Sequence, residues 1–235
     1  CSESNDLGMS DPFCKEAVRF THCYTTSTLT VPVLSSVFTG LYPYEHSVRT
    51  NSQFLKNRFH TLPELAVESG YRTAFFSSGA PLLRRTGLNQ GFEVFDDSLG
   101  VKPNYIRNLA ALSEDFVTWR ASFSGPFFAV LYLQDLHFQS TAVTDVGEYS
   151  LGSWQSTIEG LEKLYEELKK NGDWDNTEVI VFGTRGTETG RLVAHSGFNI
   201  NRERTQVPLW IKPTYGKRDV RSFRSVDVPV SLVDI

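Results

Sequence analysis

The spacing of apolar positions along the chain alternates between a helical repeat and short continuous runs. Apolar residues that recur every three or four positions predict amphipathic helices, whereas short apolar runs bounded by Gly, Pro or Asn predict buried strands. The helices expected on this basis cover residues 11–18, 32–38, 61–70, 106–123 and 153–170. The expected strands cover residues 71–77, 127–133, 178–182 and 207–211.

Capping residues support three of these helices. Asp11 can cap the first helix, with Pro12 at its first position. Pro32 can open the second helix, which Gly40 ends. Thr61 can cap the third, with a glutamate three residues later to complete a capping box. Gly70 is expected to close this third helix.

The alternation of strands and helices predicts an α/β fold: a mostly parallel sheet with helices on both faces. Residues 127–133 and 178–182 lack polar alternation, so both are expected to be inner strands. In open α/β sheets the chemistry lies beyond the carboxyl ends of the strands. This places the candidate chemistry in the loop after Phe76, in residues 134–138 and in residues 183–188.

Composition narrows the class of protein. With 40% hydrophobic and 21% charged residues, the chain is an ordinary globular mixture. A net charge of -4 and a pI of about 5.8 do not fit a protein whose main partner is nucleic acid. The longest apolar run, residues 127–133, is too short to cross a bilayer, so we expect no transmembrane segment. Residues 202–224 are locally basic, which suits either a solvated surface or a patch for an acidic partner.

The three cysteines give no disulfide framework and no metal-site spacing. Cys14 and Cys23 are expected to be buried free thiols. Cys1 is followed by a small polar stretch, residues 2–8, which is how a mature, lipidated bacterial lipoprotein begins. On that interpretation Cys1 carries a lipid anchor and the protein is periplasmic or otherwise extracytoplasmic. Alternatively, the chain was simply cut at Cys1.

One stretch carries a specific motif. Residues 28–43 read TLTVPVLSSVFTGLYP. This stretch resembles the nucleophile motif of the sulfatase family in the alkaline phosphatase-like superfamily, which is Cys or Ser, any residue, Pro, Ser, Arg and then a helix ending in Thr-Gly-Leu-Tyr-Pro. Further segments that resemble the family in the same order are residues 17–21, 45–49, 61–65, 70–74, 91–93, 126–137, 175–186 and 207–209.

The resemblance implies a division of the chain into residues 1–10, a tether or truncated segment, and residues 11–235, a sulfatase-like α/β domain. The family's first strand, which supplies the first metal carboxylates, is not evident in residues 1–10. Either it has been deleted or it lies upstream. Residues 231–235 resemble the point at which the family continues into a further C-terminal subdomain.

The resemblance also implies a nucleophile at a helix N-terminus and a divalent cation held by carboxylates. Thr30 stands at the nucleophile position, and a threonine cannot become the formylglycine that sulfatases use. Superfamily members that transfer phosphoryl groups do use Thr or Ser. However, Val33 and Leu34 replace the motif's Ser and Arg, so the group that normally fixes the nucleophile and the anion is missing.

A second departure affects the metal. Where the family has Ser-Asp-His-Gly, this chain has Thr184 in place of the aspartate ligand, followed by Arg185 and Gly186. Arg185 would repel a cation, so no cofactor is expected as the sequence stands. Arg185 could instead replace the cation as a bidentate partner for sulfate or phosphate.

Four polar residues could still face the cleft that holds the active site in the sulfatase family. Thr30 is at the ancestral catalytic position, and His137, Arg185 and His195 are candidates for binding an anion or substrate. The other titratable residues are expected to be structural or solvated: His22 and His46 as packed histidines, Arg84 and Arg85 in a turn, and Asp96 and Asp97 in a loop.

Two functions follow. In the first, the protein is a degenerate sulfatase-like domain that binds a protein partner or an anionic ligand, or serves as a scaffold. In the second, it is a sulfate or phosphate ester hydrolase or transferase that uses Thr30 as nucleophile. The second requires Ca²⁺ or another divalent cation, with carboxylates supplied from upstream sequence.

Overall fold

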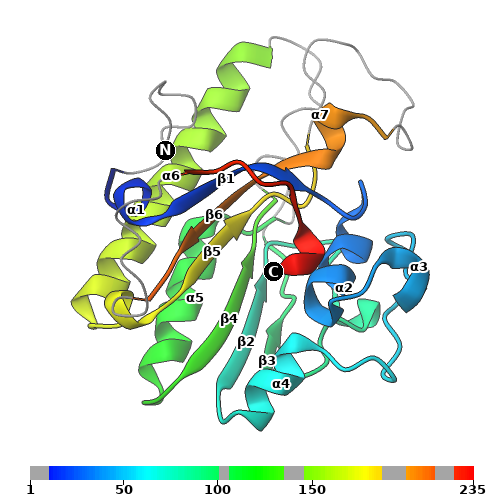
Figure 1. Cartoon of the computed structure of the whole chain (residues 1–235). Coiled ribbons are helices and arrows are strands. Elements are labelled where there is room, and N and C mark those ends of the chain that lie inside the picture. The colour runs from blue at the N-terminus through cyan, green and yellow to red at the C-terminus, as the bar shows by residue number, and fades with distance from the viewer. Residues whose placement is uncertain (1–10, 101–105, 135–145, 187–199, 215–224) are drawn as a thin grey trace. The chain divides into compact units, whose positions relative to one another are not determined.

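A computed structural model of the chain describes residues 11–100, 106–134, 146–186, 200–214 and 225–235 (Figure 1). Within these residues the chain divides into two units, each with its own sheet. Unit 1 comprises the described residues within Cys1–Lys15, Pro63–Arg84 and Gly91–Thr177. Unit 2 comprises those within Glu16–Leu62, Arg85–Gln90 and Glu178–Ile235.

The sheet of unit 1 has three parallel strands in the order β3-β2-β4. They are β2 (Arg72–Ser77), β3 (Val94–Asp96) and β4 (Phe127–Tyr132). Every residue of β2 after its first is buried, which is the pattern of a parallel strand covered on both faces. The hydrophobic run that predicted this strand is therefore explained by its central position.

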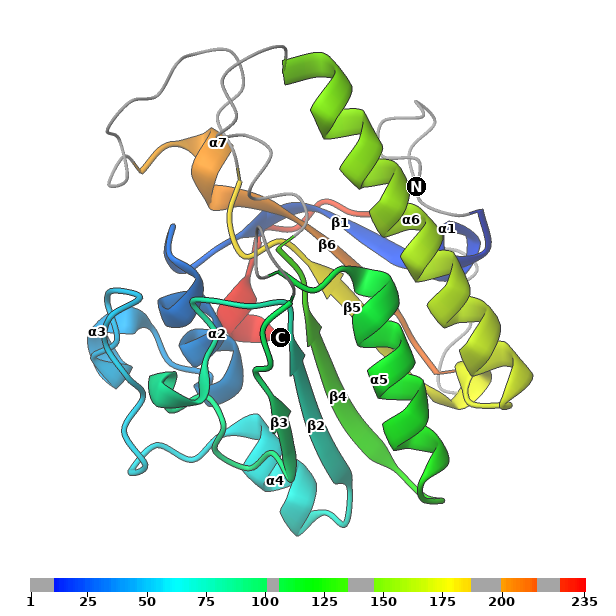
Figure 2. The ribbon, with the colours of Figure 1, turned by 180° about the vertical axis from the view of Figure 1, so that it is seen from behind.

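Two long helices belong to unit 1, α5 (Leu109–Ala121) and α6 (Val146–Lys170). The side chain of Asn108 caps α5 by accepting a hydrogen bond from the Ala111 N–H at 3.0 Å. Figure 2 shows the two helices side by side, and Gly160 explains how they approach. A Cβ at Gly160 would lie 2.7 Å from the Leu109 side chain, so the contact leaves no room for one.

Aromatic rings fill the space between α5 and its sheet. Phe116 and Trp119 of α5 lie 6.5 and 6.2 Å from the ring of Phe76 on β2. The same two rings lie 5.8 and 6.3 Å from Phe127 on β4. These are the separations at which aromatic pairs add to simple apolar burial, and they fix the helix on the sheet.

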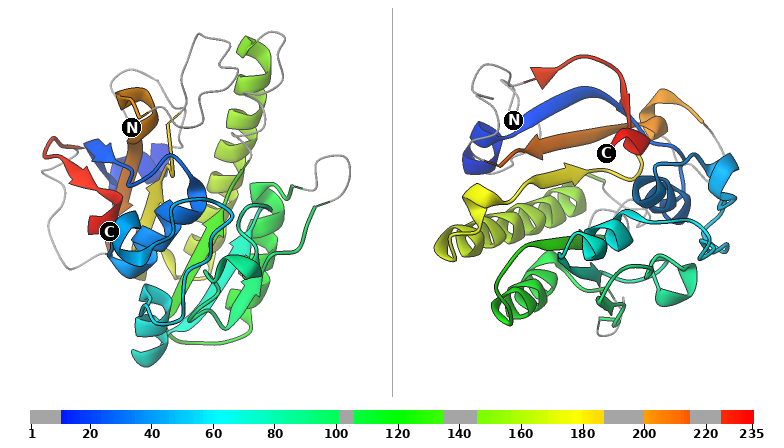
Figure 3. Two further views of the ribbon diagram at one scale, coloured as in Figure 1. Left: turned by 90° about the vertical axis from the view of Figure 1, so that its right-hand side faces the viewer. Right: turned by 60° about the horizontal axis from the view of Figure 1, so that its bottom comes forward.

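The sheet of unit 2 has five strands. They are β1 (Val18–Tyr24), β5 (Val179–Phe182), β6 (Gln206–Lys212), β7 (Ser225–Val226) and β8 (Val230–Ser231). Strand β6 lies between β5 and β1 and is antiparallel to both, whereas β7 and β8 are parallel to β1 (Figure 3). Because β1 and β5 run in the same direction, their carboxyl ends lie at one edge of the sheet.

Helix α2 (Thr30–Thr39) follows β1 and is the most buried helix of unit 2, with all its residues buried except Thr39. Pro32 falls in the first turn, where its missing N–H costs no intrahelical bond. Gly40 ends the helix in the left-handed conformation, at φ 66°, and donates its N–H to the Ser36 carbonyl at 2.9 Å. The start and end signals read from the sequence are thus confirmed to within two residues.

The remaining helices are short. They are α1 (Asp11–Glu16), α3 (Pro43–His46), α4 (Leu62–Glu68), α7 (Arg202–Thr205) and the 3-10 turns Arg84–Thr86, Trp174–Asn176 and Leu232–Asp234. Within the described ranges, no helix is both long and apolar enough to span a membrane.

The α/β class is confirmed, but two sequence predictions are wrong in detail. The first helix ends at Glu16 rather than near Val18, and a strand that the sequence did not predict, β1, follows it. The sheet of unit 2 is mixed rather than mostly parallel. Within their own units, β4 pairs with β2 and β5 with β6, and the expectation that both are inner strands stays a prediction.

Candidate functional site

Three segments of unit 2 meet beyond the carboxyl end of β1. The backbone N–H of Thr25, just after β1, donates to the Thr205 carbonyl at the end of α7 over 2.8 Å. The Thr25 hydroxyl lies 2.7 Å from the carbonyl oxygen of Thr184, in the loop after β5. Thr25 therefore joins the segment that leads into α2 to the loop that follows β5. Because it is buried, the residue is a structural tie rather than a solvent-exposed group.

The loop after β5 is held through its backbone. The Gly183 N–H donates to the Pro208 carbonyl at 3.0 Å, and the Gly186 N–H donates to the Arg204 carbonyl at 2.9 Å. A Cβ on Gly186 would lie 1.8 Å from the carbonyl oxygen of Glu203, so only glycine allows this approach of α7. Between the two glycines, Thr184 and Arg185 are half-buried. The loop thus brings a guanidinium to the carboxyl edge of the sheet.

The N-terminus of α2 is capped by a distant side chain. Thr30, its first residue, is 8% exposed. The next N–H, that of Val31, donates to Asn51 Oδ1 at 3.0 Å, and Pro32 has no N–H to offer. Free N–H groups at a helix N-terminus are what attract an anion, and one of them is already used by Asn51.

The residues described at this edge do not supply the ligand set of a divalent cation. Ca²⁺ and Mg²⁺ take carboxylate and other oxygen ligands, whereas the loop offers the neutral Thr184 and the cation of Arg185. The Thr184 carbonyl is already engaged by Thr25. Across the described part of the chain, no three His, Cys, Asp or Glu residues gather in a group that could hold a metal ion.

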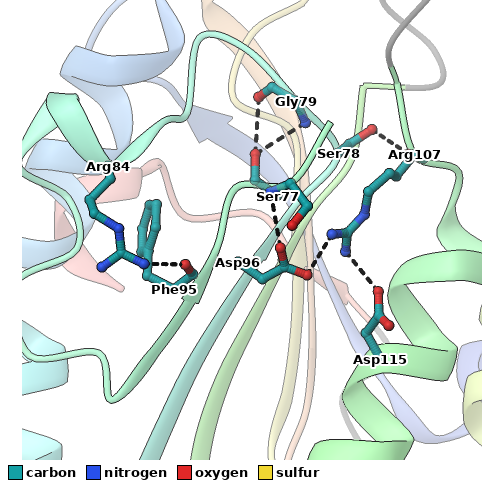
Figure 4. Close-up of polar contacts among 9 residues, drawn as sticks. Ser77, Ser78, Gly79, Arg84, Phe95, Asp96, Arg107 and Asp115 are labelled. Atoms are coloured by element: carbon teal, nitrogen blue, oxygen red, sulfur yellow. Dashed lines mark hydrogen bonds and ion pairs between the residues drawn. The ribbon is translucent and has the colours of Figure 1, made fainter. Parts of the chain in front are cut away.

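The corresponding edge of unit 1 contains a closed polar cluster (Figure 4). Arg107 donates through Nη1 to Asp96, at 2.5 Å, and through Nη2 to Asp115, at 2.9 Å. The backbone of Arg107 is bonded twice to Ser78, through its N–H at 2.9 Å and its carbonyl at 2.5 Å. The Arg107 side chain is only 10% exposed. This cluster ties the loop after β2 to the end of β3 and the start of α5.

The electrostatics of Asp96 reflect these contacts. Burial by itself would raise the pKa of the carboxyl, but hydrogen bonds from Ser98 and Arg107 and the charge of Arg107 outweigh it and hold the pKa below its usual value. The Asp97 carboxylate accepts the backbone N–H of Arg84 at 2.8 Å. Both aspartates thus have structural partners at the end of β3.

The loop after β2 is also fixed internally. The Ser77 hydroxyl lies 3.0 Å from the Gly79 carbonyl oxygen and accepts the Gly79 N–H at 3.1 Å (Figure 4). Gln134, at the start of the second predicted loop, is buried and donates to the Ala80 carbonyl. The hydroxyls of Ser77 and Ser78 and the amide of Gln134 therefore bind backbone atoms of the protein.

The two histidines that were predicted to be structural both form hydrogen bonds within the protein. His46 is 1% exposed, accepts the Val48 N–H at Nδ1 over 3.1 Å, and pairs through Nε2 with the Ser36 hydroxyl at 3.1 Å. Burial lowers the pKa of His46, so the ring is neutral. The His22 ring pairs with the neighbouring Thr21 hydroxyl at 2.9 Å.

The cysteine and arginine predictions are confirmed where the structure describes them. Cys23 is a buried free thiol, and burial, together with the charge of Asp234, raises its pKa to about 11. Arg84 and Arg85 are exposed on a turn, with Arg84 also donating to the Phe95 carbonyl at 2.6 Å.

Of the four candidate site residues, Thr30 and Arg185 belong to the described part of unit 2. His137 and His195 lie outside the described residues, as do Cys1 and the side chain of Cys14. The convergence of the four residues therefore stays a prediction. Asn51 was not found from the sequence, and nothing local marks it, because its partner is 20 positions away.

Comparison with known proteins identifies the fold. The family model Sulfatase matches residues 8–235. No curated protein matches the chain.

Three solved structures illustrate the likeness. The phosphonate monoester hydrolase of Agrobacterium radiobacter is 17% identical with a TM-score of 0.72, over 96% of this chain and 66% of that one. A putative sulfatase from Bacteroides thetaiotaomicron is 17% identical with a TM-score of 0.74, over 95% and 62%. An alkaline phosphatase superfamily protein from Vibrio parahaemolyticus is 19% identical with a TM-score of 0.69, over 96% and 57%. The chain thus spans less than two thirds of the length of these proteins.

Proposed function

Because the chain belongs to the sulfatase family, we propose that it is a non-catalytic member that binds an anionic ligand, or a partner presenting one, at the carboxyl edge of the unit 2 sheet. The observation that carries the proposal is the loop after β5. Its backbone is fixed at both glycines, and by the sequence resemblance Thr184 and Arg185 occupy the positions where a metal-dependent enzyme of the family has an acidic ligand and its neighbour.

The charge at this loop favours binding over hydrolysis. A guanidinium binds sulfate or phosphate through two parallel hydrogen bonds and needs no metal to do so. It supplies no activated nucleophile, however. Thr30 is a weakly acidic hydroxyl, and hydrolysis through it would require a base and a charge-stabilising group in addition to Arg185.

The competing function is ester hydrolysis or transfer with Thr30 as nucleophile and a divalent cation as cofactor. One observation favours it: Thr30 is the first residue of α2, and the helix dipole would stabilise an anion there. Opposing it, the Val31 N–H is engaged by Asn51 and the motif's arginine is replaced by Leu34. Loss of a single preorganised donor costs about 100-fold or more in rate, so several such losses leave little activity.

One set of variants separates the two functions. Binding of inorganic sulfate and phosphate to the full chain is measured by calorimetry, for wild type, Arg185→Ala and Arg185→Lys. We expect binding that weakens about tenfold or more in Arg185→Ala and is only partly restored by Arg185→Lys, since a bidentate contact then becomes a single charge. Arg202→Ala, an exposed arginine of α7, is the control.

The same preparations are assayed with an aryl sulfate and a phosphate diester, with and without Ca²⁺ or Mg²⁺. We expect turnover at background level for wild type and for Thr30→Ala alike. Turnover by wild type that disappears in Thr30→Ala would establish the hydrolase instead. Anion binding that is unaffected by Arg185→Ala would remove Arg185 from the site and contradict the proposal.

A further inference from the structure

The stretch that begins just before α3 and ends before α4 exposes three aromatic side chains. Tyr42 is 41% exposed, Tyr44 69% and Phe54 61%. All three belong to unit 2, in which α3 packs beside α2 (Figure 1). We call residues 42–60 the aromatic-basic segment. Three well-exposed aromatic side chains thus lie within 13 positions of one another along the chain.

The aromatic-basic segment is fixed in place. The Tyr42 N–H donates to Glu45 Oε2 at 2.8 Å and closes a capping box over α3. The rings of Tyr42 and Tyr44 are stacked, with centroids 6.2 Å apart and planes 12° from parallel. His46 anchors this end through its buried hydrogen bond to Ser36. The tyrosine pair is thus held outward by structure, and little ordering is needed before it can bind.

The second half of the segment is similarly anchored. The Gln53 side chain accepts the N–H groups of Arg49 and Thr50, at 2.6 and 3.1 Å. Asn51 is tied to α2 through Val31, and Leu55 is completely buried. Phe54 therefore projects from a turn whose two flanks are both attached to the rest of unit 2.

The charge of the segment is opposite to that of the whole chain. Arg49, Lys56 and Arg58 are exposed cations, and Glu45 is the one carboxylate within residues 42–60. The segment therefore carries +2, so the rest of a chain of net charge -4 carries -6. Glu45 is also committed to capping α3. An anionic surface would be attracted here and repelled on average elsewhere.

We propose that the aromatic-basic segment binds reversibly to the surface of an anionic lipid bilayer. Tyrosine rings favour the headgroup level of a membrane, and phenylalanine favours the boundary of the acyl chains. Lysine and arginine beside them are attracted to anionic lipids. Three apolar side chains separated by polar residues form no continuous apolar core of the kind that a stable protein interface has, whereas a fluid bilayer accepts them singly.

The proposal predicts how strongly the protein prefers anionic to neutral lipid. Each Lys or Arg close to an anionic leaflet contributes about fivefold to binding, so three cations give a preference of about 100-fold for an anionic over a neutral bilayer. Because this attraction is screened by salt, it should weaken strongly between 50 mM and 500 mM salt. The aromatic side chains contribute the part of the binding that persists at high salt.

Vesicle sedimentation with the full chain tests this inference. The probes are vesicles of phosphatidylcholine alone and vesicles containing about one third phosphatidylglycerol. We expect binding to the second kind, about 100-fold weaker binding to the first, and loss with added salt. Tyr44→Ser combined with Phe54→Ser should reduce binding about tenfold at high salt. Arg49→Gln, Lys56→Gln and Arg58→Gln together should abolish the lipid preference.

Matched controls make the test specific. Leu99→Ser and Val228→Ser remove side chains of comparable exposure, 56% and 64%, outside the segment and should leave binding unchanged. Circular dichroism checks that each variant is folded. Equal binding to both vesicle types, or equal losses in the control variants, would overturn the proposal. Binding to soluble polyglutamate with none to vesicles would assign the surface to an acidic macromolecule instead and would likewise overturn it.

Discussion

The carboxyl edges of the two sheets use their polar groups in opposite ways. In unit 1 the edge is occupied by the cluster of Arg107, Asp96 and Asp115, in which a buried charge meets two carboxylates. In unit 2 the edge is held by backbone hydrogen bonds and the Thr25 hydroxyl, and Arg185 lies in the loop that these bonds hold. Where side-chain charges hold the fold together they are not available for a ligand. Where the backbone does so, side chains can change at little cost to stability.

The largest expected effect comes from removing the charge that unit 1 depends on. Arg107→Ala removes the cationic partner of Asp96 and leaves it only its hydrogen bond from Ser98, and loss of one member of a buried pair costs about 3 kcal/mol of unfolding free energy. Arg185→Ala in unit 2 should cost less than about 1 kcal/mol, because the loop there is held by its backbone. Urea unfolding monitored by tryptophan fluorescence measures both.

Asp115→Ala is the control for the first variant, since that carboxylate is 49% exposed and an exposed pair contributes little. Equal stability losses in Arg107→Ala and Arg185→Ala would remove the distinction between the two edges.

A smaller effect is expected at the start of α2. Asn51→Ala removes the acceptor of the Val31 N–H and should cost about 1 kcal/mol, as loss of a helix cap does. Asn51→Asp keeps an acceptor and adds a negative charge at the helix N-terminus, so it should be neutral or stabilising by a few tenths of a kcal/mol. Thermal unfolding compares the two variants with Ser52→Ala. If the aspartate variant proves as unstable as the alanine variant, Asn51 is not acting as a cap.

The smallest effect is a difference in pH response. The pKa of His46 is lowered in the folded protein from its ordinary value of 6.5. Below pH 6.5 the unfolded chain therefore binds a proton at this residue more readily than the folded chain does. The free energy of unfolding should then fall as the pH falls below 6.5. Asp96 also has a lowered pKa, but the stability it provides is present above 3.8 and is lost only as pH falls below that value. Urea unfolding between pH 7.5 and 5 should show the His46 slope.

His46→Gln should flatten this slope. A slope that survives in His46→Gln would have to come from another group.

The sequence predicted α2 well because its signals are local. Pro32 near the start and Gly40 at the end are visible within ten residues of each other. Strand β1 was missed because a bulge between Phe20 and Cys23 interrupts its alternation and places Thr21 and His22 side by side. The direction of β6 was missed for a different reason: apolar composition shows burial but does not show which way a strand runs.

Candidate site residues could be proposed from the sequence only where their signals are local. Thr30 and Arg185 could be named because they stand inside recognisable motifs. Asn51 and the Arg107 cluster could not, because each depends on a pairing between elements that are separate in sequence. Hydrogen bonds formed only after folding leave no pattern along the chain.

The backbone anchoring of residues 183–186 has a consequence for engineering. Gly183, the Thr184 carbonyl and Gly186 are all held through their main-chain atoms, so the path of the loop has support that does not depend on side-chain identity at residues 184 and 185. The loop is therefore a suitable place to introduce new metal-ligating side chains. Carboxylates could be grafted at these two positions without redesigning their support, provided that Gly186 is kept.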